Sequence, residues 1–179
     1  MESPLAVLLR NGTHADATIR LALKAEQLAV TTTRTPIQVP MPHYSPLLAD
    51  MGFSRPALTV SGLIDNVGGD NSNSTSGFEN MESISLTDSG GTAQTYYIPY
   101  KNYLEKFLTE AYAFFSTGLF ECEFGDSTTP ISTSSAASTG GGIYKCVVGQ
   151  FQFTIAPGTE DRWVYSISLP AHVRSDIQF

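Results

Sequence analysis

The sequence predicts a mainly β protein, built as an antiparallel β-sandwich or split β-barrel with one amphipathic α-helix (about residues 100–116) packed on it. The segments Arg55–Asp65 and Arg162–Leu169 alternate apolar and polar residues with a period of two, which places every second side chain on one face of a sheet. Only one stretch between them spaces its apolar residues as a helix does. Segments rich in Gly, Ser and Asn separate the apolar ones, as is typical of turns and loops.

Length and composition favour one domain. The chain has 179 residues, which suits a single domain over residues 1–179. Charged residues make up 15%, below the usual quarter, and hydrophobic residues 41%. This composition suits an all-β protein with many turns, or a subunit whose surface is covered by neighbours. We expect an extended N-terminal arm and long polar loops at 66–80 and 125–142.

The first third of the chain predicts strands and a proline-rich segment. Pro4–Arg10 is predicted to form a short strand, and alternating apolar residues from Ile19 predict a second that continues to Arg34. A helix is the alternative over residues 17–28, which contain many good helix formers. The segment Pro36–Pro46 holds four prolines, which exclude a helix or a central strand. We expect an extended arm or a covering loop there.

The middle of the chain carries the predicted helix. Short strands are expected around Ile84–Leu86 and Thr95–Ile98. Pro99 precedes the helix and Gly118 follows it, as helix boundaries favour. One apolar stripe runs along the helix at intervals of three and four residues, formed by Leu104, Phe107, Leu108, Ala111 and Phe115.

The last third predicts three strands. Residues 119–124 form the first, and Ile143–Ile155 form a long one with a bulge at Gly149. The strand from Arg162 to Leu169 closes the domain. We expect the tail from Ala171 onward to pair with a neighbouring molecule.

Charge restricts the class of partner. The net charge is −7 and the isoelectric point is near 4.8, which argues against a classical nucleic-acid binder and against docking on an anionic membrane. No run of apolar residues is long enough for a transmembrane helix. The apolar patch Leu5–Leu9 is short and has no basic region before it, so no secretory signal is expected.

No group of residues predicts catalysis. His14, His43 and His172 are scattered, and no nucleophile elbow is present. Cys122 and Cys146 lie in predicted strands, where they are small buried residues or a cross-strand disulfide, since zinc would require two further ligands. We therefore expect no enzyme, no cofactor, and no catalytic, cofactor-binding or metal-binding residue.

The segment Asp65–Asn73 is rich in oxygen ligands and glycine, as calcium sites are. Its spacing matches neither an EF-hand nor a repeated calcium β-roll. A loop between strands is the favoured interpretation.

The order of elements resembles the β-barrel and β-sandwich proteins of bacteriophage tails, namely tail-tube proteins, distal tail proteins and the hub or tube-initiating proteins of baseplates. The resemblance covers roughly residues 30–170. The segments that carry it are a proline-containing entry strand, an alternating strand after an arginine, a single helix and a final hairpin: Thr35–Pro40, Gly52 with Arg55–Gly62, Tyr103–Phe115, Gly149–Phe153 and Arg162–Leu169.

The resemblance implies a structural role in the virion. Such subunits form homo-oligomeric rings, usually hexameric, by joining sheets edge to edge. The rings stack against adjacent tail or baseplate proteins, and DNA passes through the channel without being specifically bound. The implied location is the virion tail, after assembly in the host cytoplasm. A net charge of the same sign as DNA agrees with a channel that does not hold the phosphates.

Two alternatives remain at this stage. One is another viral structural protein, such as a tail terminator, a head–tail connector or a capsid decoration protein. The other is a carbohydrate-binding β-sandwich module, which requires exposed aromatic residues on one face. The candidates for such a face are Tyr96, Tyr97, Tyr100, Tyr103 and Trp163.

Overall fold

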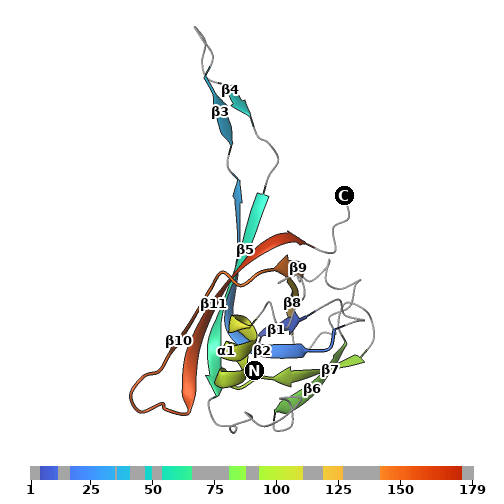
Figure 1. The fold of residues 1–179 in the computed structure, drawn as a ribbon, viewed down its shortest axis with the longest axis vertical. Coiled ribbons are helices and arrows are strands. Elements are labelled where there is room, and N and C mark those ends of the chain that lie inside the picture. Colours follow the sequence, from blue (N-terminus) through green and yellow to red (C-terminus); the bar gives the residue numbers. More distant parts are fainter. Residues whose placement is uncertain are drawn as a thin grey trace.

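Eleven strands and one short helix make up the described part of a computed structural model of the chain (Figure 1). The structure describes residues 5–11, 17–34, 36–40, 47–49, 54–65, 81–87, 93–110, 119–126 and 142–174. The elements in chain order are β1 (Leu5–Arg10), β2 (Arg20–Arg34), β3 (Ile37–Val39), β4 (Leu47–Ala49), β5 (Ser54–Asp65), β6 (Glu82–Thr87), β7 (Ala93–Ile98), α1 (Lys101–Thr109), β8 (Phe120–Asp126), β9 (Gly142–Cys146), β10 (Gln150–Thr154) and β11 (Arg162–Arg174).

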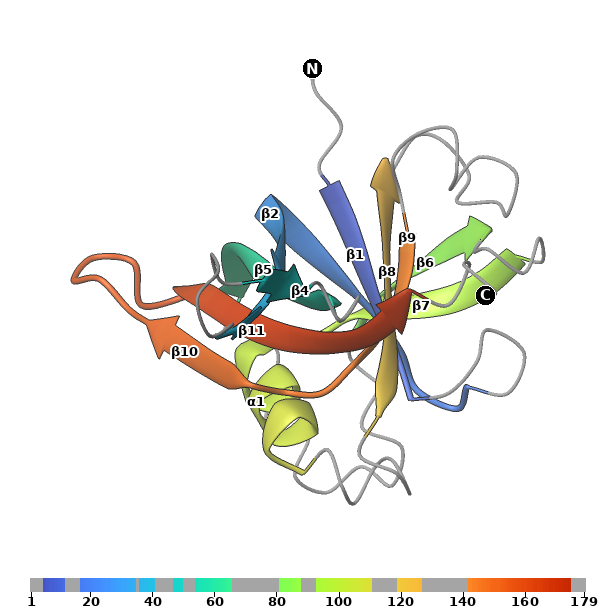
Figure 2. The same cartoon turned by 90° about the horizontal axis from the view of Figure 1, so that it is seen from above.

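Six strands close into an antiparallel barrel (Figure 2). The sheet runs β1-β8-β9-β11-β5-β2, and β2 pairs back with β1. Of the two predicted architectures, the barrel is therefore the observed one, and it is closed. Closure removes the unpaired edges that an open sheet of these strands would expose.

The two alternating segments of the sequence lie side by side in the barrel wall. β5 and β11 pair antiparallel from Asp65↔Arg162 to Ala57↔Pro170. The apolar residues of each strand face inward and are buried, as the alternation predicts. They are Leu58, Val60, Ile64, Tyr165, Ile167 and Leu169.

The segment for which a helix was the alternative is a strand. β2 runs for fifteen residues, and Leu21, Leu23 and Ala25 are buried in the barrel interior. Burial of a period-two face overrides the helix propensity of the Ala, Leu, Lys and Glu residues in this segment. Its register against β5 shifts between Ala25 and Gln27, which marks a bulge in the strand.

Helix α1 packs on the barrel core through the predicted stripe. Leu104, Phe107 and Leu108 are buried in the main hydrophobic cluster. The Phe107 ring meets Phe120 edge to face, with centroids 6.2 Å apart. The helix ends at Thr109, earlier than the predicted residue 116. Residues 111–118, which include two members of the predicted stripe, lie outside the described residues.

The predicted long strand at residues 143–155 is two strands, β9 and β10. Between them, the Val147 amide donates to the Pro170 carbonyl at 3.0 Å and the Gly149 amide donates to the Ser168 carbonyl at 2.9 Å. A Cβ at Gly149 would lie 2.7 Å from the Pro170 ring, so this close approach requires glycine. The predicted irregularity at Gly149 is a break in the strand, and the register shift lies opposite, between Ala171 and Val173 of β11.

The chain beyond Leu169 continues β11 instead of joining a neighbour. Residues 171–174 pair with β9 of the same molecule, so the predicted pairing of this part of the tail with another molecule is wrong. Residues 175–179 and the predicted loop 66–80 lie outside the described residues. Of the predicted loop 125–142, the first two residues belong to β8 and the last to β9.

The β6–β7 hairpin packs on the outside of the barrel. Leu8 and Ala22 alternate with inward-facing neighbours on β1 and β2, so they face outward. They form a small buried cluster with Tyr96 of β7, against which Ile84 and Leu86 of β6 pack. β7 also pairs parallel with β2 at Leu21↔Tyr97.

Candidate interaction surfaces

An ionic cluster is buried between the barrel and the β6–β7 hairpin. The Arg10 guanidinium donates to Glu123 at 2.7 Å, to Glu121 at 2.8 Å and to the Tyr96 hydroxyl at 3.2 Å. Burial alone would lower the pKa of Arg10, but Tyr96 and the two carboxylates raise it above its ordinary value. The cluster joins β1, β8 and β7. Its burial makes it a structural contact between barrel and hairpin.

The two cysteines meet inside the barrel. Cys122 on β8 and Cys146 on β9 are both fully buried, and both thiols are free. A hydrogen bond with Cys146 and burial raise the pKa of the Cys122 thiol well above its ordinary value. Both residues therefore act as small core residues in this structure.

The scattered titratable residues do not gather into a site among the described residues. His14 and His43 lie outside the described part, and the calcium-like segment is described only at Asp65, whose carboxylate lies 3.6 Å from Arg162. Over the residues that the structure places, no three His, Cys, Asp or Glu side chains come close enough to share a metal ion. No described helix has the length and apolarity needed to cross a membrane.

The aromatic candidates for a sugar site do not share one exposed face. Tyr96 is fully buried, and Tyr97, Tyr103 and Trp163 pack against the main core. The Lys101 ammonium covers Trp163, with Nζ 4.9 Å from the ring centroid. These rings therefore contribute to packing within the molecule.

A two-stranded arm extends the β2–β5 hairpin beyond the barrel. β3 and β4 pair antiparallel with each other from Ile37↔Ala49 to Val39↔Leu47, and with no other described strand. Figure 1 shows this pair projecting along the long axis of the molecule, away from the barrel and the helix. Pro36, Gln38 and Pro40 are exposed. An isolated pair of strands is marginally stable in water, so the arm is the part of the described structure that most needs an external contact.

Two strands outside the closed barrel present an unpaired edge. Among the described strands, β6 pairs only with β7, and β10 pairs only with β11. An unpaired edge offers a row of backbone donors and acceptors to another chain.

The outer face of the sheet β10-β11-β5-β2 is mostly uncharged over its central part, where Glu26 of β2 lines a cavity with Leu63. Residues that alternate with the buried core positions face outward on these strands. They are Gln150, Gln152 and Thr154 on β10, Val164, Ser166 and Ser168 on β11, Thr59, Ser61 and Leu63 on β5, and Gln27 and Ala29 on β2. Surfaces of soluble proteins usually carry many more charges. We call these residues the uncharged face.

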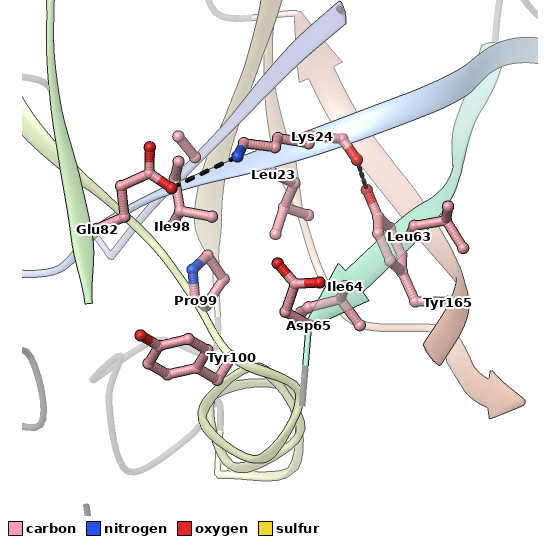
Figure 3. Close-up of a pocket in the computed structure, with 11 residues that line it drawn as sticks. Leu23, Lys24, Leu63, Ile64, Asp65, Glu82, Ile98, Pro99, Tyr100 and Tyr165 are labelled. Atoms are coloured by element: carbon pink, nitrogen blue, oxygen red, sulfur yellow. Dashed lines mark hydrogen bonds and ion pairs between the residues drawn. The ribbon is translucent and has the colours of Figure 1, made fainter. Parts of the chain in front are cut away.

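A groove lies at the end of β5 that is far from the arm (Figure 3). It consists of two adjoining cavities of about 220 and 270 Å³ that share Lys24, Leu63 and Asp65. The apolar part of its lining comes from β2, β5, the end of β7 and the two residues before α1. It is formed by Ala22, Leu23, Leu63, Ile64, Ile98, Pro99 and Tyr100.

Four of the five charged side chains that line the groove form opposite pairs. Lys24 lies 3.5 Å from Glu82, and Arg162 lies 3.6 Å from Asp65. All four side chains are largely exposed, so each pair contributes little to stability. With Glu26, which lines the second cavity, the groove holds three acidic and two basic side chains, so it is acidic like the chain as a whole.

Comparison with known proteins gives a loose likeness in fold. No family model matches the chain, and no curated protein matches it. Among solved structures, the chain is similar to the SPP1 tail tube, whose structure was determined by solid-state NMR and cryo-EM. The two are 9% identical, with a TM-score of 0.47 over 97% of this chain and 76% of that chain.

The groove could not be found from the sequence alone. Its lining comes from β2, β5, β6, β7, β11 and the segment before α1, which the placement of β7 beside β2 helps to bring together. The available signal is Leu63, an apolar residue on the outward face of an alternating strand, which is 42% exposed.

Proposed function

We propose that this chain is a structural virion protein, a ring-forming subunit of a phage tail tube or baseplate. In this role it performs no catalysis and needs no cofactor. Its partners are further copies of itself, in a hexameric ring, and adjacent tail or baseplate proteins. DNA passes through the ring and is not specifically bound. The location is the virion tail, after assembly in the host cytoplasm.

The observation that carries this proposal is the arm. Among the described strands, β3 and β4 pair only with each other, and Pro36 and Pro40, which flank β3, are exposed. An isolated pair of strands of this kind is marginally stable by itself in water. It becomes ordered contact area when another molecule covers it, as in an assembly.

Lateral contacts in the ring are assigned to the two unpaired edges. β6 and β10 belong to different sides of the barrel, so the edge of one can pair with the edge of the other in the next copy. A contact between two different surfaces generates a closed ring when the rotation between copies closes. Edge strands that are a liability in a monomer thereby become the interface.

The uncharged face suits the wall of a channel for DNA. Lysine or arginine on such a wall would bind phosphates and release counterions, which slows movement of the DNA. Ser166, Gln152 and Thr59 offer neutral polar groups in their place.

The test is imaging of the purified protein over a concentration series, with mass photometry of the same samples. We expect rings with a central hole, six-fold averages, and masses in multiples of the 19.3 kDa chain. A uniform monomer at every concentration would contradict self-assembly. A response of the fluorescence of Trp163 to glycans in that monomer would favour the carbohydrate-binding alternative.

A substitution in β6 tests whether its unpaired edge joins another copy. Ile84 is a partly buried residue of β6, whereas Ser85 of the same strand is exposed. Replacing Ser85 with proline removes one backbone N–H and disfavours pairing along this strand. Ser85→Ala is the matched control, because it keeps the N–H. We expect Ser85→Pro to reduce ring formation and Ser85→Ala to leave it unchanged.

A further inference from the structure

We propose that Cys122 and Cys146 are the site of an oxidative modification, in which a peroxide converts their thiols to a disulfide that cross-links β8 to β9 inside the barrel. The disulfide belongs to the barrel itself and does not depend on how copies of the chain assemble. The chain contains two cysteines, so neither has a different cysteine to pair with in the same molecule.

The strand register brings the two thiols to one face of neighbouring strands. β8 and β9 pair antiparallel, with Phe120 opposite Cys146 and Cys122 opposite Tyr144. The cysteines are therefore diagonal neighbours on the inward face, and both are buried in the main hydrophobic cluster. The Cys122 thiol is hydrogen-bonded to that of Cys146. The two sulfur atoms are thus in contact before any bond forms.

Closing the bond requires a small movement, which the end of β9 allows. Diagonal neighbours have Cα atoms about 7–8 Å apart, whereas a disulfide usually spans at most about 6.8 Å. Cys146 is the last residue of β9 and pairs on its other side with Ala171, next to the register shift in β11. The ladder is already disrupted at such a shift, so a displacement of about 1 Å there leaves the regular part of the sheet in place.

Burial decides which oxidant can act. The hydrogen bond and burial hold the pKa of the Cys122 thiol well above its ordinary value, so little of the reactive thiolate is present at neutral pH. Buried thiols are reached only when the structure opens locally. Val147, next to Cys146, is 38% exposed, so the end of β9 is the nearest entrance. A local opening there admits a molecule as small as hydrogen peroxide before it admits a bulky disulfide.

The reaction balances in two steps. The Cys146 thiolate attacks one oxygen of hydrogen peroxide, the O–O bond breaks, and the departing hydroxide takes up the thiol proton as water, which leaves a sulfenic acid. The Cys122 sulfur then attacks the Cys146 sulfur. The S–S bond forms, the S–O bond breaks, and the hydroxyl leaves as water with the Cys122 proton. The two thiols lose two protons and two electrons in total, and the peroxide is reduced to two molecules of water.

The cross-link closes a long loop of the chain. It encloses residues 123–145, which include most of β8 and β9. A disulfide around such a loop restricts the unfolded chain and so favours the folded state. The modified barrel is therefore expected to be more stable than the reduced one.

The proposed function gives the modification a time, and this part alone rests on that function. Host cytoplasm keeps thiols reduced, whereas extracellular surroundings let disulfides persist. A subunit that assembles in the cytoplasm would do so with both thiols free and would be cross-linked after the particle is released. Assembly then needs no disulfide, and the finished particle gains stability from it.

The first test treats the folded protein with hydrogen peroxide in urea concentrations below the unfolding transition, which promote local opening. We expect both thiols to be lost together and a non-reducing gel to show a monomer. Peptide mapping by mass should find Cys122 joined to Cys146, with the loss of two hydrogens. Thiols that persist in the folded protein, or that are lost only above the unfolding transition, would overturn the proposal.

A matched variant moves one thiol out of the core. Cys146→Ala combined with Val147→Cys keeps two cysteines but places the second at the neighbouring exposed position. We expect this variant to form sulfinic acid or a link between two molecules, and no disulfide within one molecule. An internal disulfide at the wild-type yield would show that the inward positions are not required, and would overturn the proposal.

The second test measures stability. The equilibrium constant for unfolding in urea should fall at least about tenfold on oxidation and return after treatment with dithiothreitol. The control is the double variant Cys122→Ala with Cys146→Ala, which undergoes the same oxidation of methionine and should show no such gain. An oxidised wild type no more stable than the reduced one would overturn the stabilising role.

The outcomes separate this inference from the ring proposal. Both tests use the isolated chain, so they give their answer whether or not rings form. Rings that form equally well from the reduced wild type and from the double alanine variant support the order of assembly before oxidation. Rings that require the disulfide would overturn that order and leave the modification itself in place.

Discussion

The hydroxyl of Tyr165 on β11 donates a hydrogen bond to the backbone carbonyl of Lys24 on β2, at 2.9 Å, across the intervening strand β5. The tyrosine crosses β5 at its cross-strand partner Gly62. A Cβ at Gly62 would lie 2.6 Å from the Lys24 carbonyl oxygen and 2.9 Å from the Tyr165 hydroxyl. The hydrogen bond thus joins β11 to β2 across β5, at Gly62, which has no side chain in its path.

Replacing Gly62 with alanine is expected to destabilise the barrel by about 2 kcal/mol, in the range for overpacking a closely packed site. The added methyl group must displace either the backbone of β2 or the tyrosine ring. The free energy of unfolding by urea measures the change. Ser61→Ala, on the outer face of the same strand, is the control and should change it by less than about 0.5 kcal/mol. Equal stability of the two variants would show that the site accommodates a side chain.

The buried ionic cluster predicts a large effect at Arg10. Arg10→Met leaves two buried carboxylates, Glu121 and Glu123, without their cation. Removing one partner of a buried ion pair typically costs about 3–5 kcal/mol. We expect a loss in this range in urea unfolding. The double variant Arg10→Met with Glu123→Leu should recover part of it, because one buried charge is then removed as well. A double variant less stable than Arg10→Met would contradict this account.

Lys101 connects the helix to the last hairpin. Its ammonium lies over the rings of Trp163 and Phe153 and forms an ion pair with Glu105. Lys101→Met keeps the aliphatic stem and removes the charge, so we expect a loss of about 1 kcal/mol. The chain has a single tryptophan, so its fluorescence reports on this contact directly. The emission should change in Lys101→Met and stay the same in the control Lys145→Met, whose lysine is exposed.

Alkaline pH is expected to destabilise the fold. Burial raises the pKa of Tyr103 to about 12. Burial, with a contribution from Glu26, also raises the pKa of Tyr165. The unfolded chain loses these protons near pH 10, so it binds fewer protons than the native state above that pH. The stabilisation by Tyr103 is complete below about pH 10 and is lost as the pH rises from about 10 to 12.

The measurement is the urea midpoint at pH 8, 10 and 11. Each such tyrosine can reduce the free energy of unfolding by at most about 1.4 kcal/mol per pH unit within its window. The variant Tyr103→Phe should lose stability less steeply than the wild type over this range. Parallel curves for the two proteins would mean that Tyr103 ionises equally in both states.

The sequence predicts the barrel wall well where one face is buried. The period-two pattern of Arg55–Asp65 and Arg162–Leu169 places the core residues correctly, because a slip by one residue would expose all of them. The apolar stripe of the helix is likewise confirmed at Leu104, Phe107 and Leu108. These elements are recognised because local pattern and burial agree.

Other features depend on contacts that no local pattern records. The break between β9 and β10 lies at Gly149, opposite the ring of Pro170. Pro170 lies twenty-one residues further along the chain. The ionic cluster joins Arg10 to residues more than eighty positions away. The choice between sandwich and closed barrel depends on one pairing, β1 with β2, whose register is not encoded in either strand alone.

Strands β2 and β5 stay paired up to Arg34↔Ser54, the last described residues before the arm on each strand. Neighbouring strands are rotated by roughly 20–25° with a fixed hand, so the direction in which the β2–β5 hairpin leaves the barrel follows from its own coiling. In an assembly that joined copies through the end of this hairpin, its coiling would contribute to the angle between successive copies. The helical pitch of such an assembly would then be a property of one hairpin. A substitution that changes the twist at the bulge between Ala25 and Gln27 would alter the pitch without touching an interface.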